Sequence, residues 1–167
     1  MEEYIIREYR PGDDHSVSAV IKAVFEEYEF PWQPERYNAD THDIQAHYIS
    51  KGGGFWVAEH AGVIVGAGAY LPIDYKTCEL HRLYFLKDHR GKGVGGRMFC
   101  TVAKNAFEKG FQEMIFWSDK VLESAHAVYE SYGAVLIGDR HVSDPEYASY
   151  DEWGFKLDLE TFLSKRR

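Results

Sequence analysis

The stretch HRGKGVGGRM (residues 89–98) carries four glycines within six residues, interleaved with cationic side chains. In one frame it reads G-x-G-x-x-G, the dinucleotide-binding fingerprint, through Gly91, Gly93 and Gly96. In the frame that begins at Arg90 it reads R-x-x-G-x-G, a different phosphate-binding pattern. Glycine lets the backbone approach an anion closely, and the first N–H groups of a following helix attract negative charge. The stretch therefore predicts a phosphate-binding loop in front of a helix.

The segments on either side of this loop predict seven strands and four helices. Apolar runs and alternation predict strands at residues 4–9, 55–60, 62–71, 77–86, 111–119 and 134–140. A last strand is predicted where apolar and polar residues alternate through Trp153, Phe155, Leu157 and Leu159. Helical periodicity predicts helices near 17–28, 43–50, from the glycine loop to 109, and 121–132. The apolar stripe expected on the last of these helices consists of Val121, Leu122, Ala125, Val128 and Tyr132.

This order places an antiparallel meander of three strands in the middle of the chain. A doubly wound dinucleotide fold instead alternates strand and helix from its start, with its glycine loop on the first strand–helix turn. Asp119 could play the acidic part of such a fold, so the topology, and not that residue, argues against a nicotinamide cofactor. A Walker A loop is excluded because no Ser or Thr follows Gly91-Lys92. We predict a single α/β (α+β) domain over residues 1–167, with a mixed central sheet of about seven strands flanked by about four helices.

The composition favours a folded cytoplasmic protein. It is 45% hydrophobic and 16% aromatic, which argues against disorder, and its net charge of −8 argues against a nucleic-acid partner. The start, MEEYIIREYR, lacks the apolar core of a signal peptide, and no segment approaches the roughly 20 apolar residues of a membrane span. Cys78 and Cys100 have no metal-type spacing, and His42 and His47 are poorly spaced to share a helix face. We therefore expect reduced thiols, no metal and no membrane partner.

Two motifs resemble those of a known family. ELHRLYFLKDHRGKGVGGRM (79–98) resembles the core motif of the GCN5-related N-acetyltransferase (GNAT) family, in which a strand precedes R-x-x-G-x-G and a helix. SAHAVYESYG (124–133) resembles that family's A-x-x-x-Y-E-x-x-G motif, and the order of elements matches along essentially the whole chain. The chain departs from the family pattern at Leu122, where many members have asparagine, and at Ala134, where many have phenylalanine. The resemblance implies the GNAT acyl-CoA acyltransferase fold with acetyl-CoA as cosubstrate.

The resemblance also implies where the coenzyme lies. The strand at 77–86 would splay from the following strand, and the pantetheine would fit between them. Backbone groups of Leu83, Tyr84 and Phe85 would bond the pantetheine and place an N–H near the thioester oxygen. The pyrophosphate would lie on the N–H groups of Arg90, Gly91, Lys92, Gly93, Val94, Gly95 and Gly96.

Acyl transfer from a thioester to an amine requires a neutral amine, a stabilised oxyanion and a proton for the leaving thiolate. Glu79 and His81 alternate with Leu83, so we expect all three on one face of their strand. By resemblance, Glu79 occupies the position of a general base and His81 a second position that some members use. Asp119 is a third candidate for the base. Tyr129 matches the family tyrosine that donates a proton to the departing thiolate.

These residues also have structural interpretations. Glu79 could form a salt bridge with Arg82 or Arg97, His81 could be a packed strand histidine, and Tyr129 could be a core aromatic residue.

The acceptor side is less defined by the sequence. By resemblance, FEEYEFPWQPERYNAD (25–40) lies where this fold builds acceptor specificity. One interpretation of this segment is an acidic, aromatic pocket for a cationic amine, formed by Glu26, Glu27, Glu29, Phe30 and Trp32. The alternative is that the same residues form a solvated helix end with a packed tryptophan. HVSDPEYASYDEW (141–153) would form a lid over the same opening.

The leading functional hypothesis is an acetyl-CoA-dependent N-acetyltransferase acting on a small amine, such as an amino acid or a derivative. The alternatives are acetylation of a protein N-terminus or lysine, and a non-catalytic acyl-CoA-binding sensor; the joint presence of Glu79, His81 and Tyr129 argues against the sensor. Exposed strand edges of this fold often pair in dimers, so the resemblance also implies a homodimer.

Overall fold

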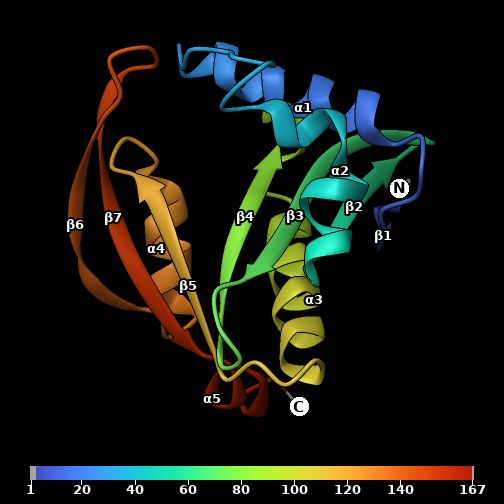
Figure 1. The fold of residues 1–167 in the computed structure, drawn as a ribbon. Coiled ribbons are helices and arrows are strands. Elements are labelled where there is room, and N and C mark those ends of the chain that lie inside the picture. The colour runs from blue at the N-terminus through green and yellow to red at the C-terminus, as the bar shows by residue number, and fades with distance from the viewer. Residues whose placement is uncertain (1–2, 167) are drawn as a thin grey trace.

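The computed structural model describes residues 3–166, so Met1, Glu2 and Arg167, which end the predicted domain, lie outside the described residues. A seven-stranded sheet runs through it in the order β1-β2-β3-β4-β5-β7-β6 (Figure 1). Its strands are β1 Ile5–Glu8, β2 Gly54–His60, β3 Val63–Pro72, β4 Thr77–Phe85, β5 Glu113–Asp119, β6 Val135–Ser143 and β7 Ser149–Asp158. The helices are α1 Asp14–Glu27, α2 Ile44–His47, α3 Val94–Glu108, α4 Glu123–Ser131 and α5 Leu159–Ser164, with short 3-10 turns η1 Ala39–His42, η2 Ile49–Lys51 and η3 Lys87–His89.

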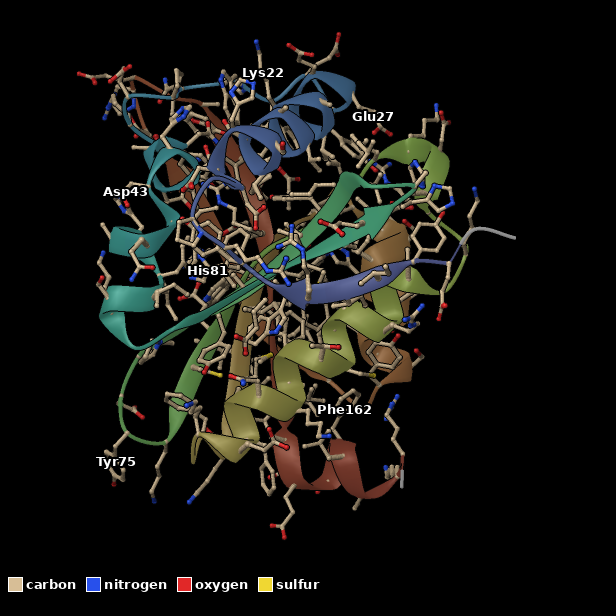
Figure 2. All side chains as sticks on the ribbon, turned by 90° about the vertical axis from the view of Figure 1, so that its right-hand side faces the viewer. Lys22, Glu27, Asp43, Tyr75, His81 and Phe162 are labelled. Atoms are coloured by element: carbon tan, nitrogen blue, oxygen red, sulfur yellow. The ribbon has the colours of Figure 1, made fainter. Side chains whose placement is uncertain are left out.

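The sheet confirms the predicted mixed class. β4 and β5 pair in parallel, while the other neighbouring strands pair antiparallel, including the predicted meander of β2, β3 and β4. Two hydrophobic clusters cover its faces: one holds the apolar sides of α1 and α2, and the other those of α3, α4 and α5. In Figure 2, Glu27 of α1 lies in the upper part of the view and Phe162 of α5 in the lower part.

The predicted last strand is one residue too long, because a fifth helix follows it. Leu159, expected to close the strand alternation, is instead the first residue of α5. The Asp158 side chain accepts a hydrogen bond from the Thr161 N–H at 2.7 Å and so caps this helix. The sequence signal for the start of α5 is Asp158, followed three residues later by Thr161 and then by the apolar pair Phe162-Leu163.

The stripe predicted for α4 is wrong in part: Ala125 and Tyr132 pack against the core, but Val121 and Val128 do not. Val121 and Val128 are 59% and 43% exposed, and the buried residues of the helix are His126 and Tyr129. The Asp119 carbonyl accepts from the Leu122 N–H at 3.0 Å, which forms a turn before the helix begins at Glu123. This turn delays the helix and changes which residues face the sheet.

None of the helices in residues 3–166 combines the length and the apolarity that crossing a bilayer requires. Within the same residues, no three His, Cys, Asp or Glu side chains are grouped so that they could hold a metal ion.

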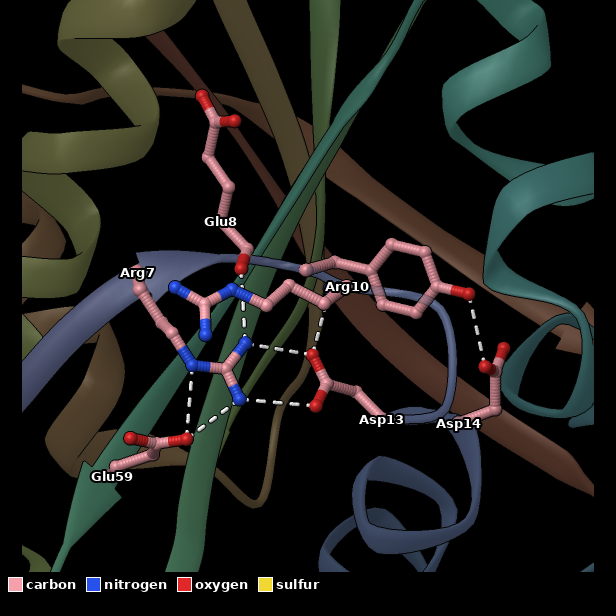
Figure 3. A network of polar contacts seen from close by, with 7 residues as sticks. Arg7, Glu8, Arg10, Asp13, Asp14 and Glu59 are labelled. Carbon is pink, nitrogen blue, oxygen red and sulfur yellow. Dashed lines mark hydrogen bonds and ion pairs between the residues drawn. The ribbon is translucent and has the colours of Figure 1, made fainter. Parts of the chain in front are cut away.

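An ion-pair network ties the first strand to the first helix (Figure 3). The Arg7 guanidinium donates to both carboxylate oxygens of Asp13, at 2.8 and 3.0 Å, and to Glu59 of β2. These hydrogen bonds outweigh the effect of burial and hold the pKa of Asp13 below its usual value. Because Asp13 is the residue that precedes α1, the network fixes the start of that helix on the sheet.

We predict that Asp13→Asn lowers the free energy of unfolding at pH 7 by about 1–2 kcal/mol, because Arg7 loses a charged acceptor. The folded-state pKa of Asp13 is depressed, so its contribution is complete above the unfolded pKa of about 3.9 and is lost as pH falls through the folded value. Urea unfolding between pH 7 and pH 2 should therefore show the two proteins converging in acid. The exposed Asp88→Asn variant is the control, and a difference that stays constant at every pH would contradict the role of the charge.

Candidate functional site

A cleft of about 1320 Å³ opens where β4 and β5 part. The two strands pair over Thr77–Glu79 and Glu113–Ile115, and beyond that point β4 stays paired with β3 and β5 with β7. In Figure 1 they lie side by side at one end and diverge toward the other. The splayed strands are those that the family resemblance implies. The glycine loop, α4, the loop after α1 and the tip of the β6–β7 hairpin also line the cleft.

The glycine loop presents a row of free N–H groups to the cleft. Gly91 and Gly93 have φ angles of 71° and 80°, in the left-handed region that glycine tolerates. The helical ladder of α3 starts with Arg97 N–H donating to the Gly93 carbonyl at 3.1 Å. None of the N–H groups of residues 91–96 donates a hydrogen bond to an acceptor among residues 3–166. These groups and the N-terminal end of α3 can together bind a pyrophosphate.

Arg90 has a different role from the one expected. Its N–H, predicted to join the phosphate site, donates to the Lys87 carbonyl at 3.2 Å. Its guanidinium donates to the Phe85 carbonyl at 2.8 Å and to both carboxylate oxygens of Glu27 at 2.8 and 2.6 Å. Arg90 therefore ties the loop to β4 and α1, and the free N–H groups begin at Gly91. Glu27, expected in the acceptor pocket, is the partner in this clamp.

The backbone of β4 beyond Arg82 faces the cleft in alternation. The Leu86 N–H donates to the Val65 carbonyl of β3 at 3.0 Å, and Tyr84 pairs with Ala67 in the same ladder. By the alternation of an antiparallel ladder, Leu83 and Phe85 direct their N–H and C=O groups to the other side, toward β5. Of the three residues expected to bind pantetheine, these two therefore offer backbone groups.

Leu83 does not share the face of Glu79 and His81, contrary to our expectation, because β4 contains a β-bulge. Arg82 and Leu83 together oppose Gly68 of β3, because the register shifts by one residue there. Leu83 consequently packs in the hydrophobic cluster on the α3 side of the sheet. Glu79 and His81 pair with residues of β3 that belong to the cluster on the α1 side. The extra residue reverses the alternation, so Glu79 and His81 share a face and Leu83 does not.

Glu79 and His81 meet in the cleft. The Glu79 carboxylate lies 3.7 Å from Nε2 of His81, and both side chains are about one-third exposed. His81, with a further attraction from Arg140, holds the pKa of Glu79 below its usual value although burial opposes it. Arg82, one of the two expected salt-bridge partners, pairs with Asp40 instead.

Asp119, the third candidate base, lines the cleft from β5. Its carboxylate accepts from the Val121 N–H at 3.0 Å, in the turn before α4.

Tyr129 is both a core residue and a cleft residue. Its ring packs against Phe99, Phe116 and Phe155, and the side chain is 8% exposed. The hydroxyl makes no hydrogen bond to another residue of the described chain, and the residue lines the cleft. Burial raises the pKa of this phenol, so it remains protonated at neutral pH.

Two segments that are distant in the sequence meet at one end of the cleft. The Gln33 amide donates to the Glu146 carbonyl, Arg36 pairs with the Glu146 carboxylate, and the rings of Tyr37 and Tyr147 stack at 4.5 Å. The hairpin tip thus reaches across the opening to the loop after α1, as the lid hypothesis expected. No sequence pattern indicates these partners, because they lie more than a hundred residues apart.

The pocket expected from residues 25–40 is formed only in part. Glu29 and Phe30 line the cleft. Trp32 instead packs edge-on against Phe25, and Glu26 pairs with Lys22 on the surface of α1.

Comparison with protein families and sequences gives a consistent result. The family model described as Acetyltransferase (GNAT) family matches residues 17–134. The Escherichia coli (strain K12) protein described as Uncharacterized N-acetyltransferase YjgM is 29% identical over 134 residues, 77% of this chain and 80% of that protein. N-acetyltransferase 8 of Mus musculus is 31% identical over 121 residues, 67% of this chain and 53% of that protein. The chain thus spans about half the length of this mammalian relative.

Solved structures share the fold. An acetyltransferase from Streptococcus agalactiae 2603 superposes with a TM-score of 0.79 at 22% identity, over 95% of this chain and 99% of that one. The yncA protein of Salmonella typhimurium, solved with its cofactor acetyl-CoA, has a TM-score of 0.77 at 19% identity, over 94% of both chains.

We predict that Gly93→Ala weakens coenzyme A binding by more than about tenfold, since moving even one or two charge-assisted hydrogen bonds costs about 1.5–3 kcal/mol each. Gly62→Ala is a matched control, because Gly62 has a φ of 77° in the remote β2–β3 turn and both positions have open space for a Cβ. Both variants should lose about 1–2 kcal/mol of stability from the strained φ. Titration calorimetry with coenzyme A should separate them, and equal affinities would contradict a phosphate site at Gly93.

Proposed function

The chain belongs to the GNAT acetyltransferase family, and on this premise we propose that it transfers the acetyl group of acetyl-CoA directly to a primary amine of a small molecule, such as an amino acid or a derivative. The observation that carries the proposal is the composition of one cleft. At one end it has a row of free N–H groups for a pyrophosphate, and between its splayed strands it brings together Glu79, His81 and Tyr129.

The coenzyme follows the gap between β4 and β5. Its pyrophosphate lies on the N–H groups of residues 91–96, and its pantetheine runs along Leu83 and Phe85. The carbonyl of Leu83 and the N–H groups of both residues are available to it, whereas the Phe85 carbonyl is occupied by Arg90. An N–H of this segment stabilises the negative charge that develops on the thioester carbonyl oxygen when the amine attacks the carbonyl carbon.

The acceptor amine must lose its proton before it attacks. A lysine-like amine has a pKa of about 10.4, so the neutral form at pH 7 lies about 4–5 kcal/mol above the charged form. Glu79 is a carboxylate at neutral pH and lies beside His81, so the pair can accept this proton directly or through a water. The amine nitrogen then bonds to the acetyl carbon, and the C–S bond breaks.

Tyr129 protonates, or donates a hydrogen bond to, the departing thiolate. The thiol of coenzyme A has a pKa of about 8.5 and a phenol about 10, so a hydrogen bond is favourable without complete proton transfer. The raised pKa of Tyr129 keeps its proton in place until the thiolate forms.

The contacts across one end of the cleft favour a small acceptor. Contacts of Gln33, Arg36 and Tyr37 with the hairpin tip bridge the walls of the cleft that Glu79 also lines, which suits a free small molecule better than a lysine on a folded surface. A flexible protein N-terminus is the second candidate, because it too can enter end-on.

We predict that Glu79→Gln lowers kcat/KM by about 10²-fold or more, and Tyr129→Phe lowers kcat by a similar factor, because each removes a proton-transfer group. Glu113→Gln and Tyr70→Phe are matched controls outside the cleft. His81→Gln and Asp119→Asn identify the base by the same comparison. Initial rates measured from pH 6 to pH 9 test the roles, and wild-type kcat for both first variants over that range would refute them.

We expect release of free coenzyme A thiol when acetyl-CoA is mixed with a panel of small amines and amino acids, and slower release with peptides. Turnover with peptides alone would favour the N-terminal acceptor. Binding of acetyl-CoA without turnover of any acceptor would favour a sensor.

A further inference from the structure

The β-bulge in β4 is built on a residue that does not suit it. Arg82 has a φ of 53°, in the left-handed region that disfavours residues with a Cβ. Glycine is the usual residue at such a bulge position. Glu29 and Ala61 also have positive φ angles, but they lie in turns at the ends of elements, whereas Arg82 lies within a strand. Strain of this kind persists only where surrounding contacts enforce it.

The contacts that enforce it come from the loop after α1. Arg82 donates to the two carboxylate oxygens of Asp40 at 2.9 and 2.6 Å and to the Tyr37 carbonyl at 3.0 Å. Tyr48 donates its hydroxyl proton to the same carboxylate. The Arg82 side chain is 9% exposed and that of Asp40 is 17% exposed, so the pair is shielded from solvent. Burial opposes the charge on Asp40, but the bonds from Arg82 keep its pKa below the usual value.

The bulge decides what β4 presents to the cleft. Without the extra residue, the alternation of the strand would continue from His81, and Leu83 would turn its backbone N–H toward β3 rather than toward the gap. With it, Leu83 and Phe85 face the gap while Glu79 and His81 keep their side chains at the acceptor end. The oxyanion donor and the base therefore keep their relative positions only while the bulge holds.

We propose that Arg82, held by Asp40, is a positioning residue for acyl transfer: the buried ion pair locks the bulge so that the Leu83 N–H points at the thioester oxygen. The pair also joins this donor to the loop that borders the acceptor, because Asp40 and Tyr37 belong to that loop. This inference rests on the proposed function, and it adds Asp40, which lies outside both GNAT motifs of the chain, and a role for Arg82 that neither motif implies.

The test compares Arg82→Gly with Asp40→Asn. Glycine tolerates the φ of the bulge and removes the lock, while asparagine preserves the shape of Asp40 and removes its charge. We expect kcat to fall by about 30-fold or more in both, since losing one oxyanion donor outright lowers kcat by about 10²–10³. The Kd of acetyl-CoA, measured by calorimetry without acceptor, should rise by a much smaller factor than kcat falls, because the glycine loop is untouched and only the contacts of Leu83 with the pantetheine change.

Asp13→Asn is the matched control. Asp13 also accepts two hydrogen bonds from one arginine (Figure 3), with similar burial, but it does not line the cleft. It should lower the melting temperature and leave kcat unchanged. Asp40→Asn decides the result should Arg82→Gly not fold, since it keeps the side-chain volume.

A kcat within threefold of wild type in folded Asp40→Asn would overturn the positioning role. Equal losses of kcat and of acetyl-CoA affinity would also overturn it, because they would indicate general damage to the fold. A wild-type protein that neither binds nor turns over acetyl-CoA would instead refute the proposed function itself, so the two failures are distinguishable.

Discussion

The parting of β4 from β5 is the constraint on which the rest of the molecule depends. β5 is paired with β7 along its whole length, and β4 is paired with β3, so neither strand can follow the other once they separate. A sheet that divides in its middle leaves backbone groups without sheet partners. The glycine loop, α4 and the tip of the β6–β7 hairpin all border this gap, which makes a structural irregularity the centre of the site.

Much of this architecture was predictable because it depends on local periodicity. Alternation located the strands, and the glycine-rich stretch before α3 located the N–H row, since both signals act over a few residues. Element order then excluded the dinucleotide folds despite the G-x-G-x-x-G match. The start of α4 was less predictable, because the Asp119 turn delays the helix and exposes Val121 and Val128.

The unpredicted features are those that couple distant residues. Nothing near Arg82 in the sequence indicates a bulge, because glycine is the expected residue there and the stabilising partner, Asp40, is 42 positions away. Arg90 illustrates the opposite error: its place in a phosphate-binding pattern suggests a ligand contact, but its partners are Glu27 and the Phe85 carbonyl. The motif therefore predicted where Arg90 lies in the fold, but it did not predict the hydrogen bonds that Arg90 makes.

The Arg36–Glu146 pair and the Arg82–Asp40 pair differ in their exposure to solvent. Arg36 is 49% exposed and Glu146 is 72% exposed, so dissolved ions screen this pair over a Debye length of about 8 Å at physiological ionic strength. Such exposed pairs contribute at most about 1 kcal/mol, and added salt weakens them further. Arg82 and Asp40 are screened far less because water and ions do not surround them. Added salt therefore acts selectively on this chain, weakening the exposed Arg36–Glu146 pair more than the buried Arg82–Asp40 pair.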